Sequence, residues 1–153
     1  MDLKIFKFGA FTIEDYNKFC DENMTFNQQV LQNGDIYVFY KPATDVGSRV
    51  IDQIVTLDKL AQAAQVEIIT AEAEDRENTV KIPKLKEKLS PLSPNSKEYK
   101  DLDEEIKGYE RRGLLNSDTI QDRKAKIVAL KETAQVMISA HLLAKQVDED
   151  IKK

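Results

Sequence analysis

Two side chains, His141 and Cys20, have the chemistry to act as a catalytic base or nucleophile near neutral pH. They are the single histidine and the single cysteine of the 153 residues. Both occupy positions in apolar patterns of helical spacing, and no serine or acid is spaced to act as a partner of His141. We therefore expect both to be packing residues, and the sequence predicts no catalytic residue. An enzyme centred on His141 is our third hypothesis.

The chain lacks the residue patterns that hold metals and nucleotides. One histidine and one cysteine cannot complete the usual ligand sets of a zinc site. The five glycines have neither the phosphate-loop nor the dinucleotide-binding spacing. The run Asp101-x-Asp103-x-Glu105 resembles the start of a calcium loop, but Ile106 stands where that loop needs glycine. The sequence therefore predicts neither a cofactor nor a metal ion.

One basic stretch could contact an anion such as a nucleic-acid phosphate. Its cations are Lys81, Lys84, Lys86, Lys88, Arg111 and Arg112. No aromatic residues are interleaved with them, and the chain as a whole has a net charge of −4, which is unfavourable for general nucleic-acid binding. A nucleic-acid accessory protein that uses these residues is therefore the alternative hypothesis.

Acidic residues gather at 72–77 and at 101–105, where we expect solvated helix faces. The first cluster lies where a helix is predicted to end, and the basic run 123–126 lies where another is predicted to begin, so each charge opposes its helix dipole. If the two helices pair antiparallel, the acidic and basic groups become neighbours. The sequence therefore predicts that they neutralise each other within the chain.

The elements that must position these side chains begin with a β-α-β-β unit over residues 1–45. Residues 3–8 are typical of a strand, and Thr12 is placed to cap a short helix behind Phe11. Asn33-Gly34 between two strand-like runs predicts a hairpin with a two-residue type I′ turn. The strand 36–40 is apolar on both faces, so we expect the remaining helices to cover the face that the short helix leaves open.

Residues 46–153 are predicted to be helical. Apolar residues at spacings of three and four predict one long helix over about 47–77 and another over about 117–152. Three prolines predict a linker over 79–95, and a short helix is predicted over about 96–112, with Gly113 as its end. The long helices match in length and are expected to pair antiparallel, with Ala61 opposite Ala134. The predicted fold is α+β, a small three-stranded unit docked on a helical hairpin.

The two long helices carry more apolar surface than one small sheet can cover, which predicts self-association or a protein partner. The predicted seam consists of Val50, Ile54, Leu57, Ala61, Ala64, Ile68, Val128, Ile138 and Leu142. Residues 1–79 also carry fourteen acidic against seven basic side chains, a surface suited to a basic partner.

Our leading hypothesis is a non-enzymatic protein that acts through protein–protein contact, such as an assembly, structural, adaptor or inhibitor component, encoded by a phage or other mobile element. The chain has no apolar run of the roughly 20 residues that span a bilayer, and its start lacks the features of a signal peptide. A single cysteine gives no sign of an oxidising compartment. We expect no membrane contact and a location in the cytoplasm, or in a particle assembled there.

Overall fold

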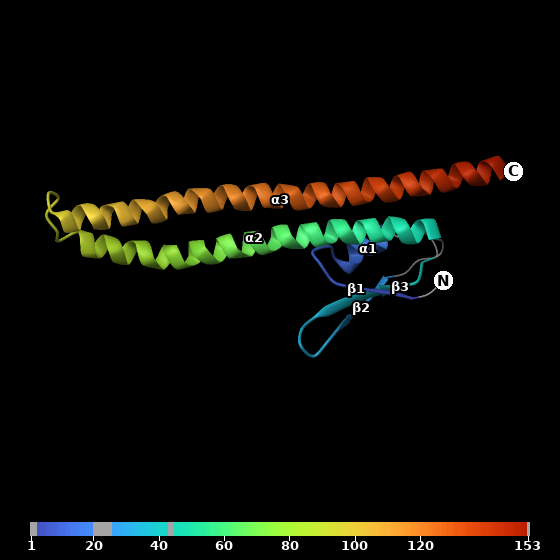
Figure 1. Ribbon diagram of the computed structural model, residues 1–153, viewed down its shortest axis with the longest axis horizontal. Helices are drawn as coiled ribbons and strands as arrows, with labels where there is room; N and C mark the ends of the chain where they lie inside the picture. The colour runs from blue at the N-terminus through green and yellow to red at the C-terminus, as the bar shows by residue number, and fades with distance from the viewer. Residues whose placement is uncertain (1–2, 20–25, 43–44, 153) are drawn as a thin grey trace. The chain divides into compact units, whose positions relative to one another are not determined.

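The computed structural model describes residues 3–19, 26–42 and 45–152, and its fold is α+β (Figure 1). The chain forms a three-stranded antiparallel sheet and a short helix, followed by two long helices on which the sheet packs. In chain order the elements are β1 (Lys4–Lys7), α1 (Ile13–Phe19), β2 (Phe26–Val30), β3 (Ile36–Tyr40), α2 (Asp45–Leu89) and α3 (Lys97–Lys152). The predicted fold class is confirmed.

The sheet has the strand order β1-β3-β2, and both pairings are antiparallel. Phe6 lies opposite Val38 and Phe26 lies opposite Tyr40, so these four side chains share one face because neighbouring residues of a strand point to opposite faces. Val38, Tyr40 and Phe26 are at most 4% exposed. This face is the one that packs into the core.

The connection between β2 and β3 differs from the predicted type I′ turn. The amide of Gly34 donates to the carbonyl of Leu31 at 3.0 Å, and the amide of Leu31 donates to the carbonyl of Asp35 at 2.8 Å. This pattern is that of a three-residue loop, and of the described residues only Gly34 has a positive φ, at 89°. Asn33 instead accepts a hydrogen bond from the amide of Asp35 with its side-chain oxygen.

The helix α1 starts as the sequence predicts. The Thr12 hydroxyl accepts a hydrogen bond from the Asp15 amide at 3.1 Å, and the Asp15 carboxylate accepts one from the Thr12 amide at 2.9 Å. Phe11 and Tyr16 stand on either side of this cap, with ring centroids 6.2 Å apart, as in a hydrophobic staple. The cap and the staple therefore fix the angle at which the chain enters α1.

The helix α2 runs through Pro83 to Leu89, so the predicted end near residue 77 is wrong. The predicted linker over 79–95 is wrong in its first part, because the connection between the two long helices comprises only residues 90–96, with Pro91 and Pro94. A proline inside a helix removes one backbone hydrogen bond, but contacts with α3 hold the helix on both sides of it. The Lys81 ammonium lies 4.7 Å from the ring centroid of Tyr109, and the Lys86 ammonium lies 3.2 Å from a Glu110 carboxylate oxygen. Tertiary contact thus overrides the local helix-breaking tendency.

The helix α3 likewise continues through Gly113, so the predicted short helix and the predicted long helix are one. A glycine in a helix interior costs only about 1 kcal/mol relative to alanine. Ile106 and Asn116, one on each side of Gly113, are 3% and 4% exposed. The packing of these neighbours is sufficient to offset a cost of that size.

The chain divides into two compact units. The sheet unit comprises Met1–Ala64 with Lys126–Lys153, and the helical unit comprises Gln65–Ala125. The predicted division at residue 45 stays a prediction. The core of the sheet unit consists of Phe11, Tyr16, Phe26, Val38, Tyr40, Ile51, Ile54, Ala61, Ala134 and Ile138. Ala61 and Ala134, which were predicted to face each other across the helix pair, are both fully buried in this core.

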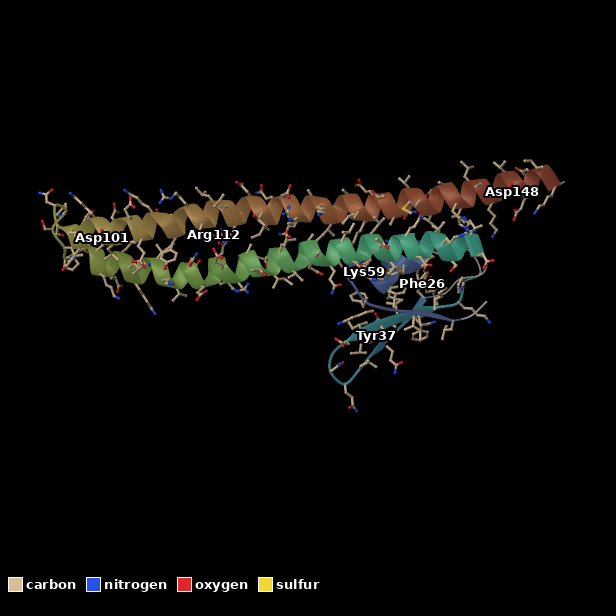
Figure 2. The ribbon with its side chains drawn as sticks, viewed as in Figure 1. Phe26, Tyr37, Lys59, Asp101, Arg112 and Asp148 are labelled. Carbon is tan, nitrogen blue, oxygen red and sulfur yellow. The ribbon has the colours of Figure 1, made fainter. Side chains whose placement is uncertain are left out.

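The second face of the sheet is not covered as the sequence predicts. Tyr37 and Phe39 belong to this face, together with Ile5, which lies opposite Phe39. Ile5 is 64% exposed, and both aromatic residues are partly exposed (Tyr37 is labelled in Figure 2). Aromatic rings can cover a sheet face with their own apolar bodies while remaining in contact with water, which is why the apolar pattern of β3 did not require a second layer.

Candidate functional site

A buried carboxylate, that of Asp58 on α2, joins the start of α1 to the long helix. Asp58 is 2% exposed, and its carboxylate accepts a hydrogen bond of 2.8 Å from the Phe11 amide. It also accepts hydrogen bonds from the Ala10 amide and from the Tyr16 hydroxyl. We call Asp58 and these three donors the Asp58 anchor.

Burial raises the pKa of the Asp58 carboxyl above its ordinary value, although the hydrogen bonds from Tyr16 and the backbone oppose this shift. Burial, and next the nearby charge of Asp58, also raises the pKa of the Tyr16 hydroxyl. Gly9 lies so close that an added Cβ would overlap the Asp58 carboxylate. Because both carboxylate oxygens are engaged by the chain itself, the geometry is that of a structural contact.

The sequence analysis gave Asp58 no role. One buried side of α2 carries Ile51, Ile54, Asp58 and Ala61, which follow one another at spacings of three and four. A carboxylate within such an apolar series is costly unless donors satisfy it. The signal that could have identified it was therefore an acid on the buried face, and its partners are found at a sequence distance of more than 40 residues.

Most of the predicted partner seam lies inside the chain. Ile54, Ala61, Ala64, Ile68 and Ile138 are at most 7% exposed, and Val50 and Leu57 pack against the core of the sheet unit. The remaining two residues, Val128 and Leu142, are 55% and 39% exposed. A partner could therefore reach the predicted seam at these two positions without separating α2 from α3.

Three of the six cations predicted as an anion site have partners within the helical unit. Arg112, labelled in Figure 2, donates from Nε to the Glu74 carboxylate at 2.6 Å. Lys81 lies over the Tyr109 ring, and Lys86 pairs with Glu110. Lys84, Lys88 and Arg111 are exposed. The basic stretch is therefore partly neutralised by contacts between α2 and α3.

In the acidic cluster at 72–77, Glu74 pairs with Arg112 of α3 and not with the basic run 123–126 that the sequence suggested. Glu74 and Asp75 both accept hydrogen bonds from the buried Asn116 amide, at 3.2 and 2.9 Å. Arg123 pairs instead with Glu67 and Asp122. The prediction assumed that both helices end in this region, whereas both continue through it, so the pairing partners are displaced along the helices.

Of the two candidate catalytic residues, His141 lies in the part of the chain that the structure describes. His141 is partly buried on α3, and its Nε2 atom has no hydrogen-bond partner among the described residues. Cys20 lies outside the described residues. Among residues 3–19, 26–42 and 45–152, no group of three or more histidine, cysteine, aspartate or glutamate side chains could hold a metal ion.

An exposed apolar stripe runs along α3 in the sheet unit, and the sequence analysis did not identify it. We call it the outer stripe, and it consists of Ala129, Thr133, Val136, Ala140, Leu143 and Val147. Val136 and Leu143 are 67% and 66% exposed. The buried residues Ala134 and Ile138 point to the opposite side of the helix, as the repeat of 3.6 residues per turn requires. A shallow groove follows the stripe, with Val136, Ala140 and Leu143 in its lining.

The central part of the outer stripe, from Thr133 to Leu143, lies between Glu132 and Lys145 in a run of α3 that has no aspartate, glutamate, lysine or arginine. Of the described helices, α3 is the one that is long and apolar enough, by length and composition alone, to cross a membrane. The apolar window that meets this test has a mean hydropathy of 1.2, and 11% of it is buried. A single helix of this kind is weak evidence for a membrane span, and these values are compatible with a soluble protein.

No family model, curated protein or solved structure matches this chain.

Proposed function

We propose that this chain is a non-enzymatic protein that works through protein–protein contact, and that the outer stripe of α3 is its contact surface. The observation that carries the proposal is the exposure of Val136, Leu143 and Val147 on one side of a helix whose other side is buried. Exposed apolar side chains that form a continuous patch are typical of interaction sites. The Asp58 anchor supports this proposal because it holds the sheet and α1 to the other long helix, which leaves the stripe uncovered.

The test replaces apolar residues of the stripe by charged ones. The variant Val136→Glu with Leu143→Glu is compared with a control, Val80→Glu with Leu114→Glu, which makes the same charge change at exposed residues of the helical unit. Molar mass is measured by light scattering, and binding is measured by capture from an extract of the source cells. We expect the wild type and the control to associate with a partner or with themselves, and the stripe variant to lose this association.

Two results would overturn the proposal. One is a stripe variant that associates as strongly as the wild type, and the other is a wild type that remains at 17.5 kDa and captures nothing. Circular dichroism of each variant verifies that the helices are intact. Salt separates two versions of the function: an inhibitor that uses the acidic residues 1–79 loses affinity as salt rises, whereas an assembly component bound through apolar side chains does not.

A further inference from the structure

We infer that the partner of the outer stripe is a second copy of this chain, bound with its α3 antiparallel to the first. This inference rests on the proposed function and specifies the partner for the same surface. The spacing of the stripe residues is four, three, four, three, four, which reads identically in both directions from the level of Ile138. An antiparallel copy of the helix therefore meets the stripe with its own stripe at every layer.

The sizes of the side chains fit this pairing. In an antiparallel arrangement centred on residue 138, each large side chain lies opposite a small one. The three kinds of layer are Val136 with Ala140, Leu143 with Thr133, and Val147 with Ala129. In a parallel arrangement each residue would face its own copy, so that one leucine pair and two valine pairs would stand among pairs of alanine and threonine. The antiparallel layers therefore differ less in volume than the parallel ones, and layers of similar volume pack at a constant distance between helix axes.

The charges at the two ends of the stripe favour the same direction. Lys126 precedes the stripe and Asp150 follows it, each three residues beyond an end of the stripe and therefore on the same side of the helix. Antiparallel copies place the basic end of one stripe near the acidic end of the other, whereas parallel copies place like charges together. Lys126 and Asp150 lie at the same level in the antiparallel arrangement. The stripe is therefore complementary to itself in both size and charge.

Single-cysteine proteins test the direction of pairing. Cys20 is replaced by serine, and either Ala129→Cys or Val147→Cys is introduced at an exposed position of the stripe. The two proteins are oxidised under mild conditions, first separately and then as a mixture, and the products are separated on a non-reducing gel. We expect a disulfide-linked dimer of one protein of each kind to form in the mixture, at several times the yield of either protein alone. A control protein with Leu114→Cys, which is exposed but lies outside the stripe, should give no such increase.

Light scattering on the uncrosslinked protein should give twice the 17.5 kDa mass, and Val136→Glu with Leu143→Glu should restore the monomer. Efficient linkage of each protein to itself would show parallel pairing and overturn the inference. A wild-type monomer without linkage would overturn it as well. If that monomer captures another protein through the stripe, the proposed function stands and the inferred self-pairing is wrong. If it captures nothing, both the proposed function and the self-pairing are wrong. Stripe-dependent binding of a monomer to phosphatidylcholine–phosphatidylglycerol vesicles would overturn both claims and show that the stripe binds a lipid surface.

Discussion

In the sheet unit, α2 and α3 meet through apolar side chains such as Ile54, Ala61, Ala134 and Ile138, all of which are at most 1% exposed. In the helical unit, the same two helices meet through a mixture of apolar and polar groups. There the buried residues include Ile68 and Ile106 but also Asn116, whose amide donates to Glu74 and Asp75. Two stretches of one helix pair thus use different contacts, because only the first also packs against a sheet.

This difference between the two units indicates where a buried polar group contributes most to stability. Aromatic rings enclose the polar group of the sheet unit: Tyr16, which donates to Asp58, has ring contacts at 5.2 Å with Phe6 and at 5.3 Å with Phe26. The polar contacts of the helical unit are more open to water, and the Glu74 side chain is 32% exposed. A hydrogen bond is stronger, and its loss more costly, where water cannot replace it. The two units should therefore respond differently to the same kind of substitution.

The largest effect is expected at the Asp58 anchor. Asp58→Ala leaves three donors without their acceptor, at a cost of about 1–3 kcal/mol for each buried donor, and we expect the free energy of unfolding of the sheet unit to fall by about 3–5 kcal/mol. Asp58→Asn should cost much less, because the amide oxygen can accept from Ala10 and Phe11 and the amide nitrogen can donate to Tyr16. Urea denaturation followed by tyrosine fluorescence measures both variants. Equal losses for the two would contradict the role assigned to the hydrogen bonds.

Replacing a glycine by alanine should change the stability of the protein in opposite directions in the two units. Gly9→Ala places a Cβ on the anchored Asp58 carboxylate, and we expect it to cost about 1–3 kcal/mol. Gly113→Ala in α3 meets nothing within 4 Å and should stabilise the protein by up to about 1 kcal/mol. Thermal unfolding followed by circular dichroism measures both variants. A stabilising Gly9→Ala would show that the loop can move away from Asp58.

Asn116→Ala should have a smaller effect than the loss of Asp58, and the effect should be confined to the helical unit. Its amide donates to two carboxylates, and we expect a loss of about 1–3 kcal/mol, the range for hydrogen bonds to charged groups. Hydrogen exchange read by mass spectrometry should rise in peptides from 65–125 and stay unchanged in peptides from 26–40. The neighbouring exposed change Ser117→Ala is the control. Faster exchange in both units would mean that they unfold together.

The smallest effect is expected from a lower pH. The change in stability that it causes should have opposite signs at the Glu74 contact of the helical unit and at the Asp58 anchor. Hydrogen bonds from Arg112 and then Asn116 lower the pKa of Glu74, so its contribution is lost as the pH falls below 4.5 and through this lowered pKa. Burial raises the pKa of Asp58, so the pH-dependent part of its contribution has the opposite sign: it is fully present below the ordinary value of 3.8 and is lost as the pH rises through the raised pKa. As the pH falls, hydrogen exchange should therefore become faster in residues 65–125 at a higher pH than at the Phe11 amide. Glu74→Gln should remove part of this sensitivity, and an unchanged acid response would contradict the assignment.

Local signals in the sequence were sufficient for the elements whose contacts are local. The Thr12 cap, the Phe11 staple and the strands around Gly34 depend on residues a few positions apart, and all three were predicted. The end of α2 was misplaced because Pro83 is a local signal that contacts with α3 override. The turn was misassigned because Asn-Gly fits two hairpin loops, and the loop length depends on pairing that begins at Leu31.

The surfaces were harder to predict than the elements. The spacing of the apolar residues in α2 showed that one side of the helix is buried, but it could not show whether the cover comes from α3 or from another chain. For the same reason the outer stripe was missed, since alanine and threonine occupy half of its positions and weaken its hydropathy signal. Asp58 was missed because its donors lie more than 40 residues away.

The core of the sheet unit also determines when this protein can fold during its synthesis. Phe11 and Tyr16 leave the ribosome before Ala134 and Ile138, which complete the same core and are added more than 100 residues later. The helical unit has all of its residues between these two groups, so it can form first. Until residue 138 has emerged, the aromatic side chains near the N-terminus lack part of their cover. A nascent chain halted before that point is therefore the form of this protein most in need of a chaperone.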